Sequence, residues 1–126
     1  GKNHLIKATL EALTYQTKDV LNAMQNDAET ELTALKVDGG ACKNNLLMQF
    51  QADMLNTTVE RPEITETTVM GAAYLAGICV GLWKQEEVLN RRKIDQEFIP
   101  TFTSEKREKL YCRWQKAIER SKNWID

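Results

Sequence analysis

Two adjacent glycines, Gly39 and Gly40, are the residues of this sequence whose type and position could form a ligand-binding site. They follow a short apolar run and come directly before a helical pattern. Glycine has no Cβ, so its backbone can take positive φ values and can lie close to a ligand. A helix start adds unpaired N–H groups and the positive end of the helix dipole. Strand, glycine pair and helix start together are a common way to bind a phosphate or nucleotide, although such a pair is more often only a tight turn.

No complete catalytic pattern stands elsewhere in the chain. The sequence has no GxxxxGK[ST] loop and no HExxH motif, and its one histidine, His4, cannot complete a Ser/His/Asp set. The three cysteines, Cys42, Cys79 and Cys112, are far apart and lack the spacing of metal ligands. We therefore expect no zinc site and no disulfide framework, and a reducing, cytoplasmic location fits best.

The composition indicates one ordinary soluble domain. The chain has 126 residues, a formal net charge of -1 and a pI of about 5.9. These values offer no electrostatic reason to expect nucleic acid or an anionic membrane as a partner. The sequence begins with Gly1 rather than Met, and a helical pattern starts within a few residues. We therefore expect a piece of a longer chain.

The elements that must position the glycine pair alternate between helix and strand. Apolar residues at helical spacing predict a first helix over residues 3–26, and a short apolar run predicts a strand over residues 32–37. A second helix is expected over residues 44–55, and a second strand over residues 57–61, stopped by Pro62. This order predicts an α/β fold whose strands are covered by helices.

The second half of the chain predicts two further helices. Residues 67–82 are apolar nearly all round, but this run is shorter than the ~20 residues that span a bilayer, so we expect a central buried helix. A charged segment, 84–97, follows, and residues 98–102 predict an edge strand or an extended connection. The last helix is expected over residues 104–125 with one apolar face. Its aromatic residues are expected in the core or at an interface: Tyr111, Trp114 and Trp124.

Several blocks of the sequence resemble one enzyme family. Residues 37–53, VDGGACKNNLLMQFQAD, are similar to the DGG-x-x-x-N-x-x-LMQ-x-x-AD stretch of the glycerol kinases, which belong to the FGGY carbohydrate kinases. Four further blocks keep the order and spacing of that family: HLIKATLE (4–11), RPEITETT (61–68), GAAYLAG (71–77) and WQKA (114–117). The last block has Gln115 where the family usually has Lys. The LMQ and ETT blocks favour glycerol kinases over xylulo- and gluconokinases.

The resemblance implies a two-domain enzyme with the actin-like (ribonuclease H-like) α/β fold, of which residues 1–126 are the C-terminal part of the second domain. It implies transfer of the γ-phosphoryl group of ATP, with Mg²⁺, to glycerol, which yields glycerol 3-phosphate and ADP. It also implies nucleotide contacts from Gly40 and Asn44, with Gly39 and Ala41 shaping the turn. The complete enzyme is expected to be cytoplasmic and homo-oligomeric.

The same resemblance places the catalytic Asp and the glycerol-binding residues upstream of this chain, so we expect the piece alone to be inactive. Asp38, just before the glycine pair, is expected to be a turn or cap residue rather than the catalytic base. Two alternatives remain open. One is the nucleotide-binding domain of another FGGY sugar kinase, and the other is a structural or oligomerisation domain that uses the aromatic last helix.

Overall fold

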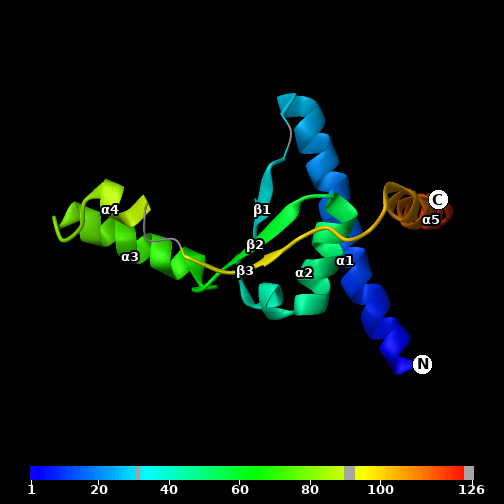
Figure 1. The fold of residues 1–126 in the computed structure, drawn as a ribbon, viewed down its shortest axis with the longest axis horizontal. Coiled ribbons are helices and arrows are strands. Elements are labelled where there is room, and N and C mark those ends of the chain that lie inside the picture. The colour runs from blue at the N-terminus through cyan, green and yellow to red at the C-terminus, as the bar shows by residue number, and fades with distance from the viewer. Residues whose placement is uncertain (31, 90–92, 124–126) are drawn as a thin grey trace.

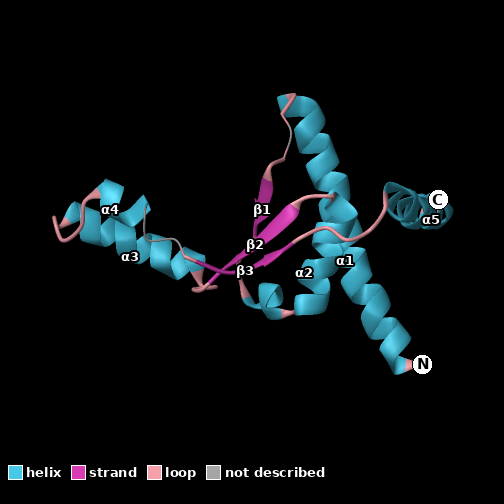
Figure 2. Ribbon diagram, viewed as in Figure 1, coloured by secondary structure: helices cyan, strands magenta, loops and turns pink. Residues whose placement is uncertain are grey.

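The structure is a computed structural model that describes residues 1–30, 32–89 and 93–123. Within these ranges, a small sheet at the centre connects two groups of helices (Figures 1 and 2). The elements in chain order are α1 (Lys2–Ala28), β1 (Ala34–Lys36), the 3-10 helix η1 (Gly40–Lys43), α2 (Asn45–Leu55), β2 (Thr58–Pro62), α3 (Thr67–Cys79), α4 (Gln85–Leu89), β3 (Ile94–Phe98) and α5 (Ser104–Ser121).

The sheet is mixed, with the strand order β1-β2-β3. β1 and β2 are parallel, with Leu35 opposite Val59, and β2 and β3 are antiparallel, with Arg61 opposite Gln96. A parallel pair needs a crossover connection, which η1 and α2 provide here. The predicted alternation of helix and strand up to residue 62 is confirmed. Pro62 does not stop the second strand but is its last residue, at an irregularity in the pairing with β3 where a missing N–H is tolerated.

The core lies between α2 and the sheet. Val59 of β2 and Ala52 of α2 are fully buried, and Phe98 closes the cluster from β3. α2 adds its buried side chains Leu47 and Met48 to this cluster. Because this cluster joins α2 to both strands of the parallel pair, it fixes the position of the turn between them.

α1 and α5 pack against each other through aromatic and polar side chains. The ring of Trp114 stacks on Tyr15 with centroids 5.2 Å apart, and its Nε1 donates to Asp19 Oδ2 at 2.9 Å. The Tyr111 hydroxyl donates to the other oxygen of Asp19. Tyr111 and Trp114 therefore occupy a helix interface, as predicted. The helix ends at Ser121, before the predicted end at residue 125, and Trp124 lies outside the described residues.

The prediction of a central buried helix at residues 67–82 is wrong. α3 and α4, together called the arm, extend away from the sheet on the side opposite to α1 (Figure 1). Gly77 is the one buried residue of α3, and Leu75 is 72% exposed. Apolar composition shows that a helix favours burial but not what covers it. Within the described residues, Trp83 packs on this helix, with its ring 5.5 Å from that of Tyr74.

The charged segment 84–97 contains two elements that the sequence did not predict, α4 and most of β3. β3 is an edge strand, and all of its residues except Phe98 are exposed. Because exposed positions can be polar, its sequence is as polar as that of a loop and does not indicate a strand. Of the two alternatives expected for residues 98–102, the connection is confirmed, because β3 ends at Phe98 and residues 99–103 connect it to α5. None of the helices in the described ranges is both long and apolar enough to cross a membrane.

Candidate functional site

The glycine pair lies where β1 leads into α2, at the carboxyl end of a parallel strand (Figure 1). Gly39 has φ 75° and ψ 177°, a backbone conformation that favours glycine. Gly40 begins η1 with no positive φ, and a Cβ placed there would meet no heavy atom within 4 Å. The fold therefore needs a glycine at position 39, whereas at position 40 the contacts within the described chain leave room for a side chain.

Backbone hydrogen bonds hold the turn in one shape. The Gly39 N–H donates to the Thr65 carbonyl at 2.8 Å, which attaches the turn to the loop after β2. The Gly39 carbonyl accepts from both the N–H and the Sγ of Cys42, at 3.3 and 2.9 Å. The N–H of Asn44 donates to the Ala41 carbonyl at 3.1 Å. Gly40 and Ala41 thus lie in a closed turn, and both are exposed.

Asn44 is the N-cap of α2. Its side-chain Oδ1 accepts from the Leu47 N–H at 3.2 Å, which satisfies one of the unpaired donors at the helix start. Its Nδ2 has no partner among the described residues, and the residue is exposed. The amide therefore uses its acceptor within the protein and leaves its donor for a ligand.

Asp38 connects the start of the turn to α3. Its carboxylate accepts from the hydroxyl of Thr67, the first residue of α3. Together with the Gly39–Thr65 hydrogen bond, this contact joins the loop after β1 to the loop after β2. The contact gives Asp38 a role in the shape of the loops.

The Cys42 side chain is buried beneath the turn, with 1% of its surface exposed. Burial raises the pKa of the Cys42 thiol, and the nearby charge of Arg61 offsets part of this effect. The thiol is therefore neutral near pH 7 and donates to the Gly39 carbonyl. A protonated, buried thiol is a structural group rather than a nucleophile. All three cysteines are free.

Sequence reasoning missed Arg61, which lies beside the turn. Its guanidinium donates to Asn45 Oδ1 at 2.7 Å and to the Cys42 carbonyl at 3.3 Å, and it pairs with Asp95 at 2.8 Å. A polar hollow of about 390 Å³ lies next to it, lined in part by Lys43. Nothing in the residue's own type or spacing announces these contacts, since Asp95 is far along the chain.

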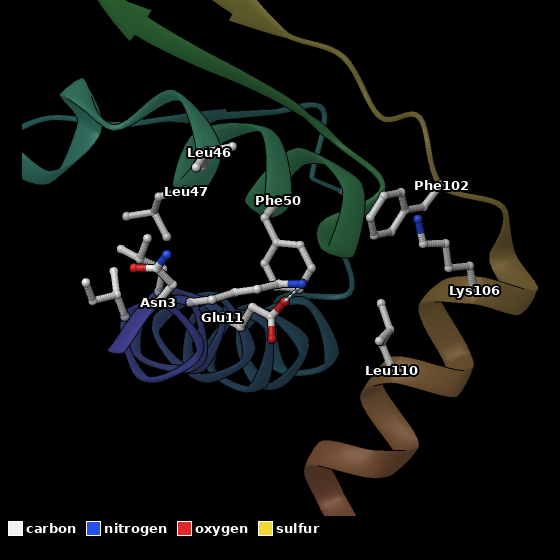
Figure 3. A pocket seen from close by; sticks show the side chains of 11 residues that line it. Asn3, Glu11, Leu46, Leu47, Phe50, Phe102, Lys106 and Leu110 are labelled. Atoms are coloured by element: carbon white, nitrogen blue, oxygen red, sulfur yellow. Dashed lines mark ion pairs between the residues drawn. The ribbon is translucent and has the colours of Figure 1, made fainter. Parts of the chain in front are cut away.

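A larger cavity of about 570 Å³ opens between α1, α2 and α5 (Figure 3). Its lining is mainly apolar, with the side chains of Phe50 and Phe102 on two sides. Lys7 and Glu11, which form an ion pair at 3.5 Å, belong to the lining as well. It includes none of the predicted nucleotide residues. Among the described residues, no group of three or more His, Cys, Asp or Glu side chains could hold a metal ion.

Comparison with known proteins decides the family. The pattern of the FGGY family of carbohydrate kinases, C-terminal domain, matches residues 1–80. The chain belongs to the FGGY family of carbohydrate kinases. It is 55% identical to a glycerol kinase of Brachyspira hyodysenteriae over 98% of its length, and 60% identical to that of Bacillus subtilis over 94%. These matches cover 25% and 24% of the two relatives, so the chain spans about a quarter of their length.

Among solved structures, this FGGY chain is similar to glycerol kinase of Plasmodium falciparum, determined with ADP. The two are 34% identical with a TM-score of 0.83, over 97% of this chain and 25% of the other. The resemblance to the glycerol kinases that the sequence blocks indicated is confirmed. The chain has a partial α/β C-terminal domain of the actin-like fold of the FGGY kinases.

Proposed function

We propose that this chain is the C-terminal part of the second domain of a two-domain glycerol kinase, and that it supplies one side of the nucleotide site. The complete enzyme would transfer the γ-phosphoryl group of ATP to glycerol. Identities of 55% and 60% to curated glycerol kinases support the choice of substrate over that of another FGGY sugar kinase. The single observation that carries the site is the exposed glycine turn at the end of β1.

Each predicted site residue has a distinct part in this proposal. Gly40 allows the nucleotide to approach the backbone, because no side chain occupies the space above it. Asn44 donates from Nδ2 while its Oδ1 caps α2. Gly39 supplies the positive φ that turns the chain, and Ala41 lies within η1. The helix start of α2 places its partial positive charge next to this turn.

Magnesium enters the proposal only with the nucleotide. In kinases the ion neutralises charge on the phosphate groups. Among the described residues, no group of three or more His, Cys, Asp or Glu side chains could hold it, and the proposal assigns the ion no ligand in this chain. The resemblance places the catalytic base and the glycerol-binding residues upstream. Phosphoryl transfer depends on positioning and on neutralising charge. We therefore expect this chain alone, mixed with glycerol and MgATP, to show no phosphoryl transfer above the background rate.

The aromatic face of α5 gives little support to a purely structural or oligomerisation role. Tyr111 and Trp114 are engaged with Asp19 and Tyr15 of α1, so they do not form a free platform. That the complete enzyme is a homo-oligomer remains part of the proposal, without a surface assigned to it. A cytoplasmic location is proposed as well, since the free thiols suit a reducing compartment.

The proposal is tested by titrating this chain with ADP and following its backbone amide NMR signals. Shifts centred on residues 39–45 would support a nucleotide turn that works without its partner domain. A folded spectrum with no shifts there would call for the same titration on the complete polypeptide. If residues 39–45 did not respond in that protein either, the nucleotide role of the turn would be wrong.

A further inference from the structure

We infer that Arg61 is a positioning residue for the proposed nucleotide turn, because its side chain joins the turn to the outer strand of the sheet. Arg61 lies in β2, opposite Gln96 of β3. Its side chain is only 13% exposed, although it is charged. The inference rests on the proposed function, since it concerns the residues that would hold the nucleotide there.

On the sheet side, β3 fixes the guanidinium. Its Nε donates to Asp95 Oδ2 at 2.8 Å, and Nη2 lies 2.8 Å from the same oxygen. Nη2 also donates to Gln96 Oε1 at 2.8 Å. The group lies over the ring of Phe98, with Cζ 5.4 Å from the ring centroid. Because the guanidinium is planar and rigid, these contacts also determine where its remaining nitrogen points.

On the turn side, the remaining nitrogen, Nη1, contacts both ends of the segment 42–45. Nη1 donates to the carbonyl of Cys42, at 3.3 Å, and to Oδ1 of Asn45, at 2.7 Å. Cys42 belongs to η1, and Asn45 is the first residue of α2. Asn44, the predicted nucleotide contact, lies between them. Cys42 also donates to the Gly39 carbonyl across Gly40, so its attachment to Arg61 limits the movement of Gly40 as well.

Arg61 acts through the turn rather than on the nucleotide itself. Each of its three side-chain nitrogens has a protein partner within 3.3 Å. No donor is left over for a phosphate oxygen, and Asp95 neutralises the charge. A lysine at this position would keep the charge but has a single ammonium group, which cannot hold β3 and the turn in the same geometry.

The test uses the complete kinase polypeptide and measures the Kd for ADP by calorimetry. Arg61→Lys is expected to raise this Kd about tenfold, as for the loss of one charge-assisted hydrogen bond. The KM for ATP should rise in proportion, while kcat at saturating ATP stays within about twofold, because binding is lost equally in the ground and transition states. Arg107→Lys is the matched control, since Arg107 donates to the Phe102 carbonyl at 2.5 Å, away from the turn.

A second pair of variants keeps the test decisive if Arg61→Lys does not fold. Asn45→Ala removes the nearer of the two acceptors on the turn side, and Asn45→Asp keeps an oxygen there. We expect Asn45→Ala to weaken ADP about as much as Arg61→Lys, and Asn45→Asp to bind as the wild type does. The double variant Arg61→Lys/Asn45→Ala should bind ADP no more weakly than Arg61→Lys alone, because Arg61→Lys already removes the contact that Asn45→Ala breaks.

Two results would overturn the inference in a wild-type polypeptide that binds ADP. One is a folded Arg61→Lys or Asn45→Ala variant whose Kd for ADP stays within about twofold of that of the wild type. A lower melting temperature in such a variant would show that Arg61 has a structural role only. The other is full additivity of the two substitutions. A wild-type polypeptide that binds no ADP would instead contradict the proposed function, so the two failures are distinguishable.

Discussion

The glycine turn with α2 and the arm of α3 and α4 both follow a strand of the parallel pair, but their surroundings differ. α2 lies on the sheet, where Ala52 and Val59 are fully buried. α3 is more uniformly apolar, yet Val69 and Leu75 are 66% and 72% exposed. The turn is held by Arg61 of β2, which β3 fixes in place, whereas in the arm the described residues include a ring contact between Tyr74 of α3 and Trp83.

This difference shows that hydrophobicity and burial are separate properties of a helix. The apolar side chains of α2 face a sheet that the same chain supplies, so their burial stabilises the turn. Those of α3 have no comparable surface in the described part of the chain. Their exposure belongs to this chain by itself, which spans only about a quarter of the length of its relatives.

The largest expected effect is the loss of stability when a core side chain next to the turn is removed. Phe98 is 4% exposed and packs in the cluster beneath α2. Phe98→Ala should lower the free energy of unfolding of this chain by about 3–5 kcal/mol, because it leaves a cavity. Leu75→Ala in the arm is the contrast and should cost less than about 0.5 kcal/mol. Urea denaturation measures both, and equal losses would contradict the difference between the two regions.

A substitution at Gly40 separates ligand binding from stability. The space above Gly40 is open, so Gly40→Val should leave the fold intact. It should weaken ADP binding by the complete polypeptide at least about tenfold, which corresponds to about 1.4 kcal/mol, because a side chain would stand where the nucleotide approaches. Gly71→Val is the matched control in the arm, where a Cβ also meets no atom within 4 Å. Unchanged ADP affinity in folded Gly40→Val would argue for a structural domain.

Two substitutions of Asn44 separate its role as the N-cap of α2 from its proposed contact with the nucleotide. Asn44→Ala removes both and should cost about 1 kcal/mol of stability, together with ADP affinity. Asn44→Ser keeps a cap oxygen but has no amide donor, so it should retain stability and still bind ADP more weakly. Thermal unfolding and ADP titration give the two readouts. A serine variant with wild-type affinity would show that Nδ2 makes no contact with the nucleotide.

The smallest effect concerns two cysteines, Cys42 under the turn and Cys79 in the arm. Iodoacetamide should modify exposed Cys79 rapidly in the folded chain, and buried Cys42 only after unfolding. Because burial raises the pKa of Cys42, its contribution to stability is complete below the pKa of an unfolded thiol and is lost as the pH rises through the higher folded value. The stability difference between wild type and Cys42→Ala should therefore shrink in alkaline solution. Fast labelling of Cys42 at neutral pH would contradict its burial.

The first half of the fold could be predicted from sequence because its elements have strong periodicity and clear ends. Asn44 has the residue type of an N-cap, and a helix begins immediately after it. Gly39 takes the positive φ that two glycines before a helix suggest. β3 could not be predicted, because Asp95 and Gln96 look like loop residues until Arg61 is seen to pair with them.

By itself, the sequence determined the alternating helices and strands, the turn at Gly39 and the cap at Asn44, because these depend on residues within a few positions of one another. The family resemblance belongs to this level as well, since it is carried by contiguous blocks. Only the tertiary structure decided that α3 is exposed and that Arg61 joins β3 to the turn. Both depend on which distant segments come together, and that is a property of the packed chain rather than of any local pattern.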